Sequence, residues 1–177
     1  MRVSRIIEKT YAEGPGCRFC IWVQGCNHRC KGCFAKELWD YNKGYEIDVK
    51  DIIDMIDSVK DKVEGITLLG GEPFDKASDL AEIAKYMHSI DKNVITFTGY
   101  TYEQIINSNN ARWNELINHT DLLIDGKFEE RLIDYSRPMV GSSNQRFFYF
   151  SDRISEELIK NYKNRFEIRY ENRSDLF

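Results

Sequence analysis

Residues 20–34 of the chain read CIWVQGCNHRCKGCF, a short apolar run that leads directly into three closely spaced cysteines. The apolar residues predict a buried strand over 20–24. Cys26, Cys30 and Cys33 follow it in a C-x3-C-x2-C pattern. Thiols this close together in a chain without disulfides are typical of a metal site. Three ligands leave such a site open unless other residues complete it.

Composition limits the classes of function that fit the chain. Its 177 residues are enough for one domain with a substantial core, and 25 basic against 29 acidic residues give a net charge of −4. This balance does not favour nucleic-acid or anionic-membrane binding, which needs clustered Lys and Arg. No stretch approaches the roughly 20 apolar residues of a membrane-spanning helix. The charged N-terminus lacks the apolar segment of a signal peptide, so we expect a cytoplasmic protein whose five cysteines bind metal or catalyse.

Apolar periodicity predicts alternating strands and helices. Residues at three- and four-residue steps indicate an amphipathic helix starting near Asp48 and a second over 78–90, capped by Ser78. Short apolar runs and further helical patterns complete the series, with strands at 65–71, 93–100, 121–127, 146–150 and 166–170, and helices at 102–118 and 153–163. The alternation predicts an α/β fold with about five to six mainly parallel strands.

Chemistry-bearing residues follow the predicted strands at their C-terminal ends, where βα barrels collect their sites. The cysteines follow the first strand, and the later strands are followed by GGEP (70–73), TGY (98–100) and DGK (125–127). Each motif has a plainer explanation when taken alone. GGEP and DGK are also typical of turns, and Thr98 and Tyr100 can simply end a strand.

Two metal centres fit the cysteines. Cys26, Cys30 and Cys33 can hold three irons of a 4Fe–4S cluster and leave the fourth iron open. Alternatively, Cys17 and Cys20 join Cys30 and Cys33 in a closed, structural zinc site. Against zinc, Cys20 lies in a predicted strand and Cys26 has no role. Buried apolar packing is then the expected role of Cys17 and Cys20.

GCNHRCKGCF (25–34) resembles the cluster loop of radical S-adenosylmethionine (SAM) enzymes, in the form found in activating proteins of anaerobic ribonucleotide reductase. The similarity continues in order over most of the chain, through EGPG (13–16), GGEP, TGYTYEQI (98–105), DGKFEERLID (125–134) and GSSNQR (141–146). The resemblance implies an incomplete TIM-like βα barrel of the radical SAM type. It implies one domain over residues 1–177, with a C-terminal extension from about residue 151 packed on it.

The resemblance also implies the site. Cys26, Cys30 and Cys33 would ligate one 4Fe–4S cluster whose open iron is chelated by SAM, and no side chain need act as acid, base or nucleophile. The residues implied to contact SAM are Gly32, Cys33, Phe34 near the adenine, Gly70, Gly71, Glu72, Thr98, Asp125 and Lys127. His28 either shapes the cluster loop or faces solvent. The segment 141–146 precedes a strand, so simple βα geometry places it away from the site.

The function implied is the activation of a partner enzyme. A flavodoxin or ferredoxin would supply one electron, and reductive cleavage of SAM would give methionine and a 5′-deoxyadenosyl radical. That radical would take a hydrogen atom from a glycine of the partner, for which the resemblance points to anaerobic ribonucleotide reductase. The alternatives are a sibling that activates another glycyl-radical enzyme or modifies a peptide, and a zinc-stabilised binding module without catalysis.

Overall fold

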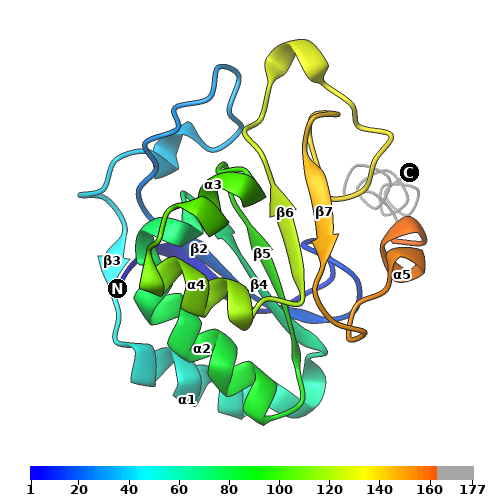
Figure 1. Cartoon of the computed structure of the whole chain (residues 1–177). Coiled ribbons are helices and arrows are strands. Elements are labelled where there is room, and N and C mark those ends of the chain that lie inside the picture. The colour runs from blue at the N-terminus through cyan, green and yellow to red at the C-terminus, as the bar shows by residue number, and fades with distance from the viewer. Residues whose placement is uncertain (163–177) are drawn as a thin grey trace, which may run out of the picture.

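A mixed β-sheet runs through the centre of the molecule, and helices cover one of its faces (Figure 1). The computed structural model describes residues 1–162. In that part of the chain the sheet has seven strands in the order β3-β1-β2-β4-β5-β6-β7. They are β1 (Arg2–Thr10), β2 (Arg18–Val23), β3 (Tyr45–Glu46), β4 (Gly65–Gly70), β5 (Asn93–Phe97), β6 (Leu122–Asp125) and β7 (Arg146–Tyr149).

Four neighbouring strands, β2, β4, β5 and β6, are parallel and form the centre of the sheet. β1, β3 and β7 run antiparallel to their neighbours, and β3 and β7 are the two edges of the sheet in the described residues. The parallel centre confirms the predicted α/β fold. The open edges agree with an incomplete barrel.

The helices connect the parallel strands and lie on one face of the sheet (Figure 1). They are α1 (Val49–Val59), α2 (Ala77–Ser89), α3 (Tyr102–Asn107) and α4 (Ala111–Asn118), while α5 (Glu156–Lys160) follows β7. Asp48 stands at the N-cap of α1, as predicted. The predicted cap at Ser78 is wrong, because α2 continues directly from a 3-10 turn over Pro73–Lys76. The carboxylate of Glu72 caps that turn by accepting from the Phe74 amide.

The central strands are buried on both faces, which explains why their sequences are continuously apolar. Phe19 and Leu68 pack toward the helices, in the same cluster as Leu80 of α2. On the opposite face, Trp22 packs with Leu69 in a separate cluster. Trp22 and Leu69 also line a cavity at the strand ends.

β1 was not predicted from the sequence. Its residues RVSRIIEKT alternate charged and apolar types, and of these only Val3 is fully buried. Ile6 pairs with Ile21 of β2, and the Arg5 guanidinium lies 4.0 Å from the centroid of the Trp22 ring. Because only one residue of β1 is fully buried, the segment has little apolar periodicity, and its charged residues conceal the strand in the sequence.

β7 corrects the predicted position of the segment 141–146. Because β7 is antiparallel to β6, its first residue, Arg146, pairs with the last residue of β6, Asp125. The start of β7 therefore lies at the same end of the sheet as the cysteine loop, not away from it. βα geometry failed here because it assumes that each new strand is parallel to the one before it.

The last described segment, which includes α5, packs against β6 of the sheet. Ile154 and Ile159 are buried in a cluster with Leu122 and Ile124. The strand predicted at 166–170 lies outside the described residues, and the single domain over the whole chain stays a prediction. No helix in the described part of the chain is long and apolar enough to cross a membrane.

An ion pair joins β7 to the rest of the sheet. The carboxylate of Asp125 is fully buried and accepts from the Tyr102 amide at 2.6 Å and from Arg146 Nε at 3.0 Å. Arg146 also contacts the half-exposed Glu103 at 2.7 Å, and these hydrogen bonds hold the pKa of Arg146 well above its usual range. Asp125 therefore connects β6 to the edge strand β7 and anchors the first turn of α3.

We predict that Asp125→Ala lowers the free energy of unfolding by about 3 kcal/mol, because it removes hydrogen bonds to a buried charged group. Glu103→Ala is the matched control, since it removes the exposed partner of the same Arg146 and should cost much less. Urea unfolding of the cluster-free protein measures both. Unchanged stability in Asp125→Ala, together with a lost affinity for SAM, would instead make Asp125 a ligand.

Candidate metal and cofactor site

An open cavity of about 270 Å³ lies at the C-terminal ends of the parallel strands. Loops after β2, β4, β5 and β6 contribute to its wall, so the strand-end motifs meet there as predicted. The lining residues are Trp22, Cys26, His28, Cys30, Cys33, Ala35, Trp39, Leu69, Gly70, Gly71, Phe97, Thr98, Gly99, Gly126, Lys127, Phe128 and Gln145.

The three cysteines of the triplet all line this cavity and are partly exposed. The Cys33 amide donates to the Cys30 carbonyl at 3.1 Å, and Gly32 takes a left-handed φ of 76° in the turn between them. Partial burial raises the pKa of Cys26 to about 11 and also raises that of Cys30. These thiols are therefore protonated at neutral pH in the cluster-free protein. Metal binding must displace their protons.

Cys17 and Cys20 do not belong to this site. Both are buried, Cys17 in the helix-side core and Cys20 on the opposite face beside Trp22. The predicted apolar packing of these two residues is thus confirmed, and the four-thiolate zinc site is not formed. Among residues 1–162, no three His, Cys, Asp or Glu side chains converge closely enough to hold a single metal ion. A 4Fe–4S cluster binds each thiolate at a different iron, and three thiols that line one cavity fit this requirement.

Two glycines bring the loop after β4 against the cysteine loop. A Cβ on Gly71 would stand 2.1 Å from the carbonyl oxygen of Gly25, and Gly70 has a φ of 108° that side chains rarely adopt. Backbone hydrogen bonds fix this approach, from the Gly71 amide to Val23 and from the Glu72 amide to Gly25, both at 2.8 Å. These two glycines therefore place the backbone after β4 directly against the start of the cysteine loop, while their contact with SAM stays a prediction.

Glu72 is a buried carboxylate that joins three loops. It is 1% exposed, and its oxygens accept from the Phe74 amide at 2.9 Å, the Gly99 amide at 2.8 Å and the Thr98 hydroxyl at 2.8 Å. His28 Nε2 lies 2.8 Å from the same carboxylate. Four partners satisfy a charge that would otherwise be costly to bury. Glu72 thus connects the loops after β2, β4 and β5 and is not among the cavity-lining residues.

His28 is held inside the cysteine loop rather than exposed to solvent. Its side chain is 9% exposed, and its ring packs edge-on against Tyr100 with centroids 4.5 Å apart. A Cβ on Gly99 would stand 2.4 Å from the imidazole, so the TGY motif leaves room for this ring. Of the two alternatives from the sequence, His28 shapes the loop.

The remaining SAM-contact predictions fall into two groups. Thr98 and Lys127 line the cavity, as do Gly70, Gly71 and Cys33. Gly32, Phe34 and Asp125 are not among the residues that line it. Phe34 is 69% exposed, with its ring 5.4 Å from Phe128. SAM contact by the individual residues stays a prediction.

Sequence reasoning missed Gln145 and Phe128 as cavity-lining residues. The Gln145 side-chain Oε1 accepts from the Gly141 amide at 3.0 Å, and its Nε2 donates to the Gly126 carbonyl at 3.4 Å. These bonds fold the segment before β7 against the end of β6. The available signal was the GSSNQR segment itself, which matches the family that the chain resembles.

Comparisons with known proteins identify the family of the chain. Residues 12–148 match the family model described as "4Fe-4S single cluster domain". The protein therefore has a radical SAM 4Fe–4S domain. The crystal structure of QueE from Escherichia coli resembles this chain with a TM-score of 0.45 and 19% sequence identity. The match covers 56% of this chain and 52% of the QueE chain.

Relatives with a common name cover most of the chain. Proteins named anaerobic ribonucleoside-triphosphate reductase-activating protein include one from Enterobacteria phage T4, 29% identical over 87% of this chain and 97% of its own. Those from Pasteurella multocida and Escherichia coli K12 are 33% and 34% identical, over 78% and 75% of this chain and 91% and 88% of theirs. The chain belongs to the 4Fe-4S single cluster domain family of radical SAM proteins, together with these activating proteins.

We predict that single Ala substitutions separate the two groups of cysteines. Cys26→Ala, Cys30→Ala and Cys33→Ala should each lose the cluster, because each removes one of three ligands. Cys17→Ala and Cys20→Ala should keep wild-type iron and sulfide content, which is measured after anaerobic reconstitution together with visible absorption. Complete loss of iron in Cys17→Ala or Cys20→Ala would contradict the assignment.

We also predict that His28→Ala loosens the cysteine loop. Removing the imidazole leaves a buried Glu72 oxygen with one partner fewer, which should cost about 1–3 kcal/mol of folding stability. The same variant should lose cluster iron to a chelator several-fold faster. The matched control is His88→Ala, which breaks a similar pair, with buried Asp121 at 3.0 Å, at the opposite end of the strands. Equal rates of iron loss in the two variants would make His28 a general stability contact.

Proposed function

We propose that this protein is a radical SAM activating enzyme that generates a glycyl radical on a partner, anaerobic ribonucleotide reductase. One observation carries the proposal: Cys26, Cys30 and Cys33 face one cavity beside Gly70 and Gly71. The names of relatives that align over three quarters or more of the chain support the choice of partner.

The residues present fit a 4Fe–4S cluster and SAM. Cys26, Cys30 and Cys33 would hold the cluster, which when reduced supplies the electron that cleaves SAM to methionine and a 5′-deoxyadenosyl radical. Three protein ligands leave one iron for SAM, and neither Cys17 nor Cys20 can reach it from its buried position.

Other cavity residues would bind and orient SAM and exclude water. Lys127 places an exposed ammonium at the cavity wall, where it can attract the SAM carboxylate. Gly70 and Gly71 present backbone without side chains. Trp22 and Phe97 provide apolar surface that keeps water from a reactive radical. No general acid or base is required of the chain.

A protein substrate is supported by exposed apolar side chains near the cavity. Phe34 and Tyr135 are 69% and 41% exposed and have ring centroids 6.3 Å apart, and Phe34 packs against the lining residue Phe128. Ile133, which is 46% exposed, lies two residues before Tyr135 in the chain. Exposed apolar side chains grouped in this way are typical of interaction sites. An entering partner segment would cover them and bring its glycine to the cavity.

The test uses the reconstituted protein under anaerobic conditions. With dithionite, we expect SAM to be cleaved to 5′-deoxyadenosine and methionine. With the anaerobic ribonucleotide reductase of the same organism added, we expect a SAM-dependent glycyl doublet in electron paramagnetic resonance.

The outcomes separate the alternatives. Cleavage without a doublet on the reductase, but with one on another glycyl-radical enzyme, would identify the sibling activity. Absence of any SAM cleavage by protein that carries its full complement of iron and sulfide would overturn the enzyme assignment.

A further inference from the structure

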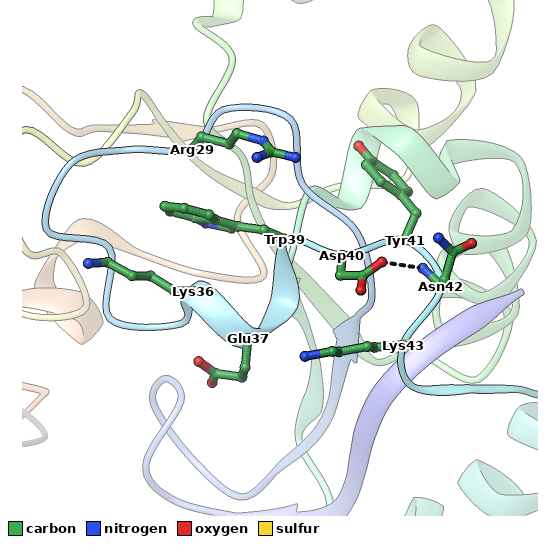
Figure 2. Close-up of a pocket in the computed structure, with 8 residues that line it drawn as sticks. All are labelled: Arg29, Lys36, Glu37, Trp39, Asp40, Tyr41, Asn42 and Lys43. Atoms are coloured by element: carbon green, nitrogen blue, oxygen red, sulfur yellow. Dashed lines mark hydrogen bonds between the residues drawn. The ribbon is translucent and has the colours of Figure 1, made fainter.

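We propose that a hollow on the outer side of the cysteine loop is the docking site for an acidic protein that donates single electrons. The inference rests on the proposed function, because only a reductively activated enzyme needs such a donor. The hollow has a volume of about 430 Å³. It is lined by Arg29, Lys36, Glu37, Trp39, Asp40, Tyr41, Asn42 and Lys43, as Figure 2 shows.

Trp39 is shared by the hollow and the cavity. It is the one residue that lines both, and its carbonyl accepts from the Cys26 amide at 3.3 Å. Arg29 lies in sequence between Cys26 and Cys30, and its guanidinium is 6.0 Å from the centroid of the Trp39 ring. Figure 2 shows the Arg29 side chain beside the indole. The hollow and the cysteine site therefore meet at Trp39.

Proximity matters because electron transfer between proteins slows steeply with distance. The donor and the group that it reduces exchange no atom. One electron leaves the donor, which is oxidised by one electron, and one electron is gained at the site held by the cysteines. Docking close to the cysteines is therefore favourable for electron transfer, and the hollow shares Trp39 with the cavity that the cysteines line.

Charge indicates the kind of partner. Three cations, Arg29, Lys36 and Lys43, line the hollow against two anions, although the whole chain has a net charge of −4. Lys36 and Lys43 are exposed, and neither forms an ion pair within residues 1–162. Unpaired cations are available to an acidic partner, and such charges mainly accelerate and orient association.

The hollow is also separate from the apolar surface proposed for the partner enzyme. Phe34, Ile133 and Tyr135 are not among its lining residues. A donor in the hollow would leave that surface uncovered. Electron entry and hydrogen abstraction can then take place from two different surfaces of one small protein.

The test is a charge reversal in the cluster-loaded protein, Lys36→Glu with Lys43→Glu. The probe is an acidic flavodoxin, and titration calorimetry at low ionic strength measures its dissociation constant. We expect binding to weaken roughly tenfold or more, and the dependence on salt to flatten, because the attraction is electrostatic. The matched control is Lys50→Glu with Lys85→Glu, which changes the net charge equally on exposed positions of α1 and α2. The control should retain wild-type affinity within about twofold.

A second measurement keeps this inference separate from the proposed function. Dithionite needs no docking site, so SAM cleavage driven by dithionite should be the same in both double variants and in the wild type. An unchanged flavodoxin affinity in Lys36→Glu/Lys43→Glu would overturn the docking site, and so would an equal loss in the control. Loss of dithionite-driven cleavage in the hollow variant alone would also overturn it, since the substitutions would then act on the site. Failure of the wild type to cleave SAM with dithionite would instead overturn the proposed function.

Discussion

The buried carboxylate of Glu72 is the constraint on which the site depends. A charge that is 1% exposed is tolerated only if its oxygens are fully hydrogen-bonded, and here the donors come from three different loops. Satisfying Glu72 therefore fixes the cysteine loop, the turn after β4 and the turn after β5 relative to one another. The contact of Gly71 with the Gly25 carbonyl makes the arrangement possible, because any larger residue would separate the loops before the hydrogen bonds formed.

Asp125 provides a second fixed point of the same kind on the other side of the cavity. It is fully buried, and it joins β6, β7 and the start of α3 through Arg146 and the Tyr102 amide. Glu72 and Asp125, the two acidic residues at strand ends, thus both hold separate segments of the chain together. Lys127, Gly70 and Gly71 line the cavity and are the residues proposed to contact SAM. This division suits a chemistry that uses no protein acid or base, because the protein has only to hold loops, bind charge and exclude water.

The strands and helices with strong periodicity were predictable, and the residues with tertiary roles were not. The apolar runs of β4 and β5 and the amphipathic pattern of α1 are local signals, and the structure has the predicted elements at these places. β1 was missed because its burial is limited to single residues, and Gln145 was misplaced because strand direction is not encoded locally. The cysteine spacing predicted that Cys26, Cys30 and Cys33 lie together, and all three line one cavity, while their role as cluster ligands stays a prediction. That Glu72 would connect loops could not be predicted, since its partners are distant in sequence.

The same connections bear on how the cluster is loaded. In zinc fingers the metal supplies the folding energy, because the apo-chain has too small a core to fold. Here the cysteine loop is fixed by protein contacts alone, through Glu72, His28 and the Gly25 carbonyl, and the strands behind it are buried on both faces. Metal binding has then to displace thiol protons, Cys26 with a pKa of about 11 among them, but not to order the loop. A preformed and open triplet is what an enzyme that must leave one iron for its cosubstrate requires.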